Sequence, residues 1–210
     1  MKSLLFLISA LTLAVPLADE ARAQPQGKSA SEQAAAAREG TDVAKRVFAS
    51  SDSAAAYKNL SKADRQKFLG VMTPGDFEPI QEKIVNEPSA SGKSFNGCWA
   101  LHATGGRKAF FGNTLYTYWQ STRVCARNGR VTMVNVYDAG GETSTPGWHI
   151  KHPPTLTRRN VGWEGRGKAE YHFVLSGPWD IQSPTDCIQL RLNADGRHYR
   201  VMNSCDLGAR

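Results

Sequence analysis

Two stretches of β-branched and aromatic residues stand on either side of a two-residue turn signal. Residues 115–124 and 131–137 are rich in Val, Thr, Tyr and Trp, the residue types that favour an extended backbone. Asn128-Gly129 lies between them, and such a dipeptide favours a tight hairpin because both turn positions need a positive φ. The sequence therefore predicts an antiparallel β-hairpin at this point of the chain.

Shorter strand-like runs follow at intervals of roughly ten residues. They cover residues 148–151, 169–175, 187–192 and 198–201. Asp195-Gly196 separates the last two runs and predicts a second hairpin. In the first hairpin, counting back from the turn places Val124 opposite Met133. Short strands joined by glycine-rich turns predict a mainly β protein, folded as an antiparallel β-sandwich or barrel.

Residues 24–92 carry a different pattern, which predicts helices. Ser61 followed by an acidic residue in the next turn is typical of a helix N-cap. A last short helix is predicted over residues 77–84, where apolar residues recur at intervals of three and four. The polar residues 86–94 are predicted to form a linker. The predicted organisation is a helical N-terminal segment with its linker over 24–92, followed by a disulfide-bonded β-sandwich domain over 93–210.

Charge is divided unevenly between these two parts. Residues 24–92 contain nine basic and nine acidic side chains, whereas residues 93–210 contain fifteen basic side chains, eleven of them Arg, and eight acidic ones. The net charge of +7 therefore belongs to the predicted β-domain. All five Trp, all five His and all four Cys also lie there. Any specific chemistry is expected in that part of the chain.

The first 23 residues predict a cleaved export signal. Lys2 precedes the apolar run 4–15, and residues 21–23 form the small-x-small pattern that signal peptidase recognises. The run is shorter than the about 20 apolar residues that span a bilayer. We therefore expect a signal peptide over 1–23, a mature chain from Gln24 without a membrane span, and a secreted product, extracellular or periplasmic.

Four cysteines fit this exported setting. They include no C-x-x-C pair, which a metal or redox site would need, and an even number in a secreted chain predicts disulfides. Cys187 and Cys205 lie nine residues on either side of Gly196, so the second hairpin would bring them nearly opposite each other. The remaining two, Cys98 and Cys125, are then predicted to pair.

Common catalytic motifs do not occur in the sequence. It lacks a G-x-S-x-G elbow, an H-E-x-x-H helix, a P-loop and a G-x-G-x-x-G loop. His149 and His152 form an H-x-x-H pair, but residues three apart in a strand face opposite sides. No catalytic residue, metal or cofactor is therefore assigned. A glycosidase-like carboxylate pair has as candidates Glu142, Glu164, Glu170, Asp180 and Asp186.

Arginine close to tryptophan is the strongest functional signal. The planar guanidinium of Arg recognises phosphate and carboxylate in a bidentate manner, and an exposed Trp stacks on a sugar ring or a base. The turn-rich stretch 141–167 combines both residue types and is expected to form surface loops, where binding usually resides. The candidate ligand-binding residues are Trp148, Arg158, Arg159, Trp163 and Arg166.

The order of several short segments indicates a family. The Gly-Cys-Trp segment 97–99 is followed by the aromatic run 112–120 and by segment 125–132, which carries the second cysteine and the hairpin turn. Over most of residues 53–205 this order resembles the small secreted, disulfide-bonded β-sandwich proteins of unknown function that are common in actinomycetes. The resemblance implies a β-sandwich and export. Because that family has no assigned activity, it implies no functional residue.

Together these features predict a secreted, non-enzymatic binding protein for an anionic or carbohydrate component of the cell envelope. Export separates the chain from most nucleic acid, which disfavours nucleic acid as a partner. Two alternatives stay open. One is a secreted hydrolase that uses a histidine beside a carboxylate. The other is a toxin or protein-interaction module, with the helical segment as its prosegment.

Overall fold

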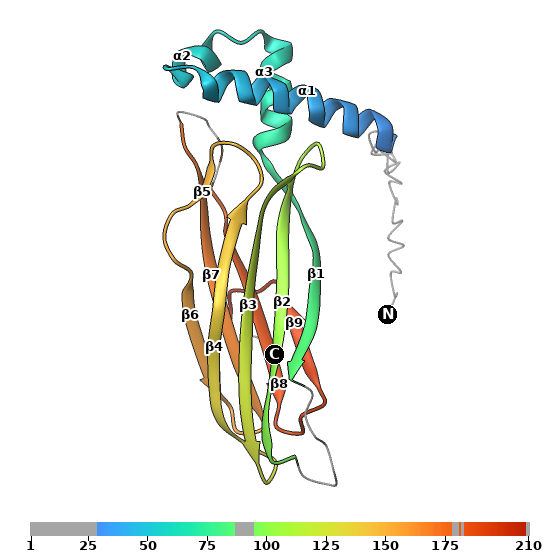
Figure 1. Cartoon of the computed structure of the whole chain (residues 1–210), viewed down its shortest axis with the longest axis vertical. Coiled ribbons are helices and arrows are strands. Elements are labelled where there is room, and N and C mark those ends of the chain that lie inside the picture. Colours follow the sequence, from blue (N-terminus) through green and yellow to red (C-terminus); the bar gives the residue numbers. More distant parts are fainter. Residues whose placement is uncertain (1–28, 87–94, 178–180, 182, 209–210) are drawn as a thin grey trace, which may run out of the picture.

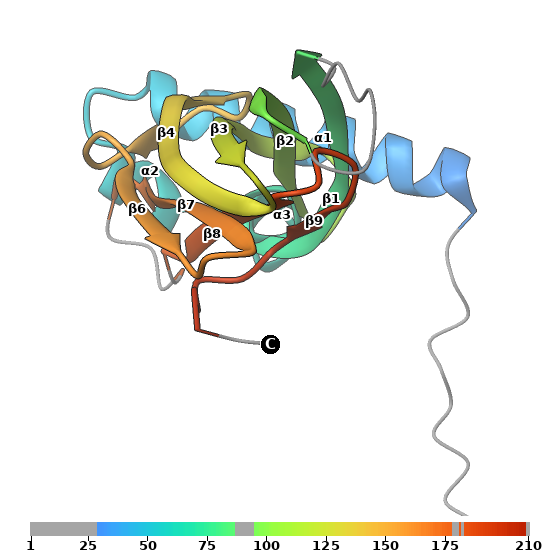
Figure 2. The same cartoon turned by 90° about the horizontal axis from the view of Figure 1, so that it is seen from below.

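Long antiparallel strands form two sheets that face each other, with helices across one end (Figures 1 and 2). The computed structural model describes residues 29–86, 95–177, 181 and 183–208. As predicted, the fold is mainly β, an antiparallel sandwich with a helical segment near its N-terminus; among the described strands the two sheets do not close into a barrel. The predicted signal peptide and linker residues 87–94 lie outside the described residues.

The first sheet is a four-stranded meander in the order β1-β2-β3-β4. Its strands are β1 (Pro74–Asn86), β2 (Gly97–Ala109), β3 (Thr114–Arg127) and β4 (Arg130–Thr143). The predicted turn joins β3 to β4: Asn128 and Gly129 have φ values of 51° and 72°. Both residues therefore adopt the left-handed backbone that this dipeptide favours.

The register of the β3–β4 hairpin corrects the sequence prediction by one residue. Val124 pairs with Val134, not with Met133. The cause is a β-bulge between the turn and this pair, where Thr132 is the extra residue and its hydroxyl donates a 3.2 Å hydrogen bond to the carbonyl of Cys125. A turn signal predicts where a hairpin reverses, whereas a bulge shifts every pair beyond it.

The second sheet pairs its strands in the order β5-β7-β8-β9, and β6 joins the same edge of β7 as β5 does. Its strands are β5 (Trp148–Ile150), β6 (Thr155–Asn160), β7 (Glu164–Leu175), β8 (Thr185–Asn193) and β9 (Tyr199–Met202). Pro153-Pro154 separate β5 from β6, because proline cannot donate a ladder hydrogen bond. The four shorter runs predicted as strands are confirmed as β5, β7, β8 and β9.

Three helices precede β1 in the described residues: α1 (Ala30–Ala49), α2 (Ser53–Lys58) and α3 (Lys62–Met72). Ser29 caps α1 in a capping box with Glu32, and Ser61 caps α3 as predicted. The helices pack through apolar residues such as Val47 and Phe68, both fully buried. None of the helices in the described part of the chain is both long enough and apolar enough to cross a bilayer.

The prediction of a helix over residues 77–84 is wrong, since these residues belong to β1. The pairing of β1 with β2 contains three register shifts, which lie between Pro74 and Phe77, between Glu78 and Gln81, and between Ile84 and Asn86. Extra residues of this kind interrupt the period of two that marks a strand. The apolar residues consequently recur at three and four, as they would in a helix.

Helix α3 is anchored on the turn between β2 and β3. The backbone amide of Phe111 donates a 2.9 Å hydrogen bond to the carbonyl of Gly70, and the side-chain amide of Asn113 donates one of 3.1 Å to the carbonyl of Val71. A Cβ on Gly70 would lie 2.4 Å from the Phe111 ring, so a larger residue would push the turn away. The helices and the sandwich are therefore joined by direct packing as well as by the chain.

Two glycines of β7 allow the two sheets to approach each other closely. A Cβ on Gly165 would lie 2.6 Å from Cγ2 of Val124, and a Cβ on Gly167 would lie 2.4 Å from Oγ1 of Thr122. Side chains alternate between the faces of a strand. Because both glycines face the opposite sheet, Arg166 between them faces away from it.

A buried ion pair connects the two sheets. Asp186 of β8 is 1% exposed and accepts hydrogen bonds from Nη2 of Arg107 in β2, at 2.7 Å, and from the hydroxyl of Tyr116 in β3, at 2.8 Å. The guanidinium carbon of Arg107 lies 3.6 Å from the ring centroid of Phe77 in β1. Burial, together with the charge of Asp186, raises the pKa of Tyr116 far above its usual value. The phenol therefore stays protonated and remains a donor.

Replacing Asp186 by Asn is expected to destabilise the fold strongly, because the partly buried guanidinium of Arg107 loses its counter-charge. We expect the free energy of unfolding to fall by about 3–5 kcal/mol, measured by urea denaturation. The control is Glu142→Gln on the exposed end of β4, for which the change is expected to stay within about 0.5 kcal/mol. Equal effects of the two substitutions would contradict the role given to the ion pair.

Candidate anion-binding site

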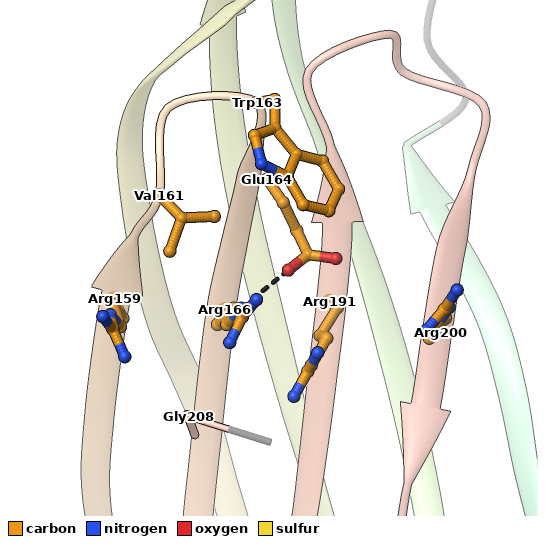
Figure 3. Close-up of a pocket in the computed structure, with 8 residues that line it drawn as sticks. All are labelled: Arg159, Val161, Trp163, Glu164, Arg166, Arg191, Arg200 and Gly208. Carbon is orange, nitrogen blue, oxygen red and sulfur yellow. Dashed lines mark hydrogen bonds and ion pairs between the residues drawn. The ribbon is translucent and has the colours of Figure 1, made fainter. Parts of the chain in front are cut away.

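The outer face of the second sheet carries a line of arginines. Successive Cα partners across β6, β7, β8 and β9 are Arg159, Arg166, Arg191 and Arg200. Residues that are directly opposite each other point to the same side of a sheet. Because Arg166 faces away from the sandwich core, its three partners do so too (Figure 3). These four residues are called the arginine row below.

The two inner members of the arginine row, Arg166 and Arg191, are buried and contact polar neighbours. Glu164 accepts a 2.6 Å hydrogen bond from Nε of Arg166, and these two residues are 3% and 7% exposed. Nε of Arg191, which is 2% exposed, donates at 2.5 Å to Oε1 of Gln189. Burial, and next the charge of Arg166, lower the pKa of Arg191. Like charges directly opposite each other destabilise a sheet, whereas the carboxylates of Glu164 and Asp206 act on Arg191 in the opposite direction.

The C-terminal segment, residues 203–208, lies across the same face of the sheet. Three consecutive carbonyls accept side-chain hydrogen bonds: Cys205 from Lys168 at 3.1 Å, Asp206 from Gln189 at 2.8 Å, and Leu207 from Arg166 at 2.6 Å. The disulfide Cys187–Cys205 ties this segment to β8. The other predicted disulfide, Cys98–Cys125, is also present and links β2 to β3. Both cysteine pairings are thus confirmed.

A pocket of about 570 Å³ lies along the arginine row, beside the C-terminal segment (Figure 3). It is lined by Arg159, Val161, Trp163, Glu164, Arg166, Arg191, Arg200 and Gly208. Four guanidinium groups and one carboxylate therefore surround one hollow. A guanidinium presents five N–H donors in a plane and recognises phosphate, sulfate or carboxylate oxygens. The chemistry of the lining favours an anionic ligand.

Trp163 is presented to this pocket by a well-fixed turn. It follows Gly162, whose φ is +90°, and the side chain of Asn160 accepts a 2.8 Å hydrogen bond from the Gly162 amide. The carbonyls of Gly162 and Trp163 accept hydrogen bonds from the amides of Val131 and Ala194, at 2.6 and 2.8 Å. With its backbone held on both sides, the indole of Trp163 is nevertheless 58% exposed.

Three of the five predicted ligand-binding residues meet in this pocket: Arg159, Trp163 and Arg166. Arg158 points to the other side of β6, where it lines a smaller hollow with Val136 of β4. Trp148 is 3% exposed and packs 5.4 Å from the ring of Tyr116, so it belongs to the core. The prediction that residues 141–167 form surface loops is wrong as well, because β6 and the start of β7 occupy much of this stretch. All six residues of β6 are exposed, which removes the alternation that marks a strand.

Arg191, Arg200 and Glu164 also line the pocket, and they are not among the binding residues predicted from the sequence. Arg191 stands between two apolar residues of β8, and this alternation places it on the outer face. The second hairpin also sets it opposite Arg200. The pairing of β7 with both β6 and β8 brings these residues together, and no turn signal in the sequence encodes that pairing. Without it, arginines on separate strands look unrelated.

The histidines lie elsewhere on the sandwich. His172 of β7 is held by Glu170 at 3.2 Å through Nε2 and by Thr185 at 3.1 Å through Nδ1. The ring centroids of His152 and His172 lie 4.7 Å apart. His149 instead forms a hydrogen bond with the hydroxyl of Ser176. Within the described ranges, no three His, Cys, Asp or Glu side chains gather in a way that could hold a metal ion.

Comparison of the chain with models of protein families, with curated proteins and with solved structures finds no match. The resemblance to secreted actinomycete β-sandwich proteins therefore stays a prediction.

Removing the disulfide Cys187–Cys205 by a double Ser substitution is expected to loosen the C-terminal segment. The loop that it closes has a sequence separation of 18 residues, for which chain entropy predicts a loss of about 3 kcal/mol in unfolding free energy. Hydrogen exchange of the amides in residues 203–208 is expected to speed up by about tenfold or more.

The matched control for this variant removes Cys98–Cys125 instead. It is expected to lower the unfolding free energy while leaving amide exchange in residues 203–208 unchanged, because that disulfide links two strands of the other sheet. Faster exchange in both variants would mean that the segment is not held by its own disulfide.

Proposed function

We propose that this chain is a secreted, non-enzymatic protein that binds an anionic polymer of the cell envelope at the arginine row. The observation that carries the proposal is the alignment of four arginines, one from each of four neighbouring strands, beside one carboxylate in a common pocket. Charge-assisted hydrogen bonds from guanidinium to anionic oxygen are among the strongest in proteins. The two outer members of the row, Arg159 and Arg200, are exposed and present such donors to solvent.

The length of the row favours a polymer over a single small anion. Neighbouring strands lie about 4.8 Å apart, so four of them spread the guanidinium groups over roughly 14 Å. A chain with repeated negative charges matches such a line, whereas one phosphate or sulfate ion spans only one or two arginines. The two outer members, Arg159 and Arg200, are exposed and open the row at both ends to a ligand that continues beyond it.

The setting supports an envelope ligand. The two disulfides indicate an oxidising, extracellular type of environment, and the first 23 residues carry the pattern of an export signal. Outside the cytoplasm, the abundant polyanions are the phosphate-, sulfate- or carboxylate-bearing polymers of cell surfaces. The excess of Arg over Lys in residues 93–210 fits the recognition of such groups.

The proposal predicts that binding depends on the row and not on net charge alone. The double variant Arg159→Ala/Arg200→Ala is expected to weaken binding to a sulfated glycan such as heparin by about tenfold or more. The slope of log K against log salt is expected to flatten by about two. Fluorescence anisotropy with a labelled oligosaccharide, at several salt concentrations, measures both quantities.

The control removes the same amount of charge elsewhere: Arg158→Ala/Arg197→Ala changes two exposed arginines that do not line the pocket. Its affinity is expected to stay within about threefold of the unmodified chain, by general electrostatics alone. Equal losses in the two double variants, or no salt-sensitive binding by the unmodified protein, would overturn the proposed function.

A further inference from the structure

We infer that the ligand of the arginine row is an anionic glycan, whose sugar ring stacks on Trp163 and whose hydroxyl group donates to Glu164. This inference rests on the proposed function and specifies its ligand. Its starting point is that the pocket contains two groups that a simple polyanion does not need, an exposed indole and a buried carboxylate.

Trp163 supplies a flat apolar surface at the edge of the cationic pocket. Its indole is 58% exposed although the turn that carries it is hydrogen-bonded on both sides. Large aromatic side chains gain much free energy from burial, so an exposed indole on a hydrogen-bonded turn offers a platform for an apolar face. Sugar rings have such a face, made by their axial C–H groups, whereas a chain of phosphates has none.

Glu164 adds a carboxylate acceptor to a pocket whose other charged lining side chains are arginines, which only donate. One of its carboxylate oxygens accepts from Arg166 at 2.6 Å, while Figure 3 shows the other turned away from Arg166. A carboxylate can accept from several donors, and sugar hydroxyls are donors of this kind. The same negative charge repels any bare polyanion that lies along the row. Glu164 therefore favours ligands that carry hydroxyl groups beside their anions.

The three elements lie in the order that an anionic sugar requires. Trp163 lies in the turn directly before β7, Glu164 is the first residue of β7, and Arg166 is the next residue of that strand on the same face. Arg191 and Arg200 extend the donors sideways across β8 and β9. A sugar placed on the indole can thus donate a hydroxyl to Glu164 and direct its phosphate, sulfate or carboxylate group to the arginines.

Nucleic acid satisfies part of this chemistry, because bases also stack on tryptophan and phosphates also bind arginine. Single-stranded DNA fits less well than a glycan, because its deoxyribose offers no free hydroxyl to donate to Glu164 and its phosphates meet the repulsion of that carboxylate. A single-stranded oligodeoxythymidylate therefore serves as a competing probe.

The test measures the dissociation constants of three probes of matched charge: a heparin oligosaccharide, inorganic polyphosphate and oligodeoxythymidylate. The unmodified mature protein is expected to prefer the glycan. Trp163→Ala is expected to weaken glycan binding by about tenfold and to change polyphosphate binding by less than about twofold. Phe110→Ala, which removes a 77% exposed ring at the helical end of the sandwich, is the control and is expected to change neither.

The variant Glu164→Gln provides a second, independent test of the glycan assignment. It keeps an acceptor oxygen but removes the negative charge, so polyphosphate affinity is expected to rise about threefold more than glycan affinity. Thermal unfolding of each variant verifies that the fold is kept. Should Glu164→Gln fail to fold, Trp163→Ala decides alone, because its side chain lies on the surface.

The outcomes separate this inference from the proposed function. Tighter binding of polyphosphate than of glycan, or equal losses for both with Trp163→Ala, overturns the glycan assignment and leaves the anion site standing. Tightest binding of oligodeoxythymidylate assigns the site to nucleic acid instead. If none of the three probes binds in a salt-sensitive manner, or if the arginine variants have no effect, the proposed function itself fails.

Discussion

The close approach of β7 to the opposite sheet is the constraint on which the rest of this structure depends. Gly165 and Gly167 leave no side chain between β7 and the residues of β3 and β4 that they face. The alternation of a strand then fixes Glu164, Arg166 and Lys168 on the outer face. A larger side chain at either glycine would force the sheets apart or flip the register. Packing on the inside thus determines which charges appear on the outside.

Much of the fold follows from local signals in the sequence. The Asn128-Gly129 and Asp195-Gly196 turns, the Ser61 cap and the cysteine spacing predict both hairpins, helix α3 and both disulfides, because each depends on residues close in the chain. The bulged β1 and the fully exposed β6 escape prediction, since neither shows the period of a strand. For a related reason, the sequence predicts only part of the candidate site. Its arginines become neighbours through strand pairing, and pairing depends on the whole sandwich.

Arginines occur between the two sheets of the sandwich and on its outer face, and they play different parts in the two places. Arg107 lies inside, paired with Asp186 and covering the ring of Phe77, so its charge serves the fold. The arginine row shares a single lining carboxylate, and its outer members face solvent. An excess of charge on one side of a domain attracts oppositely charged partners over several ångströms and speeds their association. The basic residues that give residues 93–210 their net charge of +7 therefore do not all play the same part.

The anchoring of α3 on the β2–β3 turn bears on how this chain would respond to a protease. The ring of Phe111 occupies the space beside Gly70, and Asn113 binds the carbonyl of Val71. Beyond α3 the chain continues directly into the edge strand β1. A cut within the helical segment would thus not liberate a separate sandwich domain. The two fragments would remain docked as a nicked complex, held by the same packing that the intact chain uses.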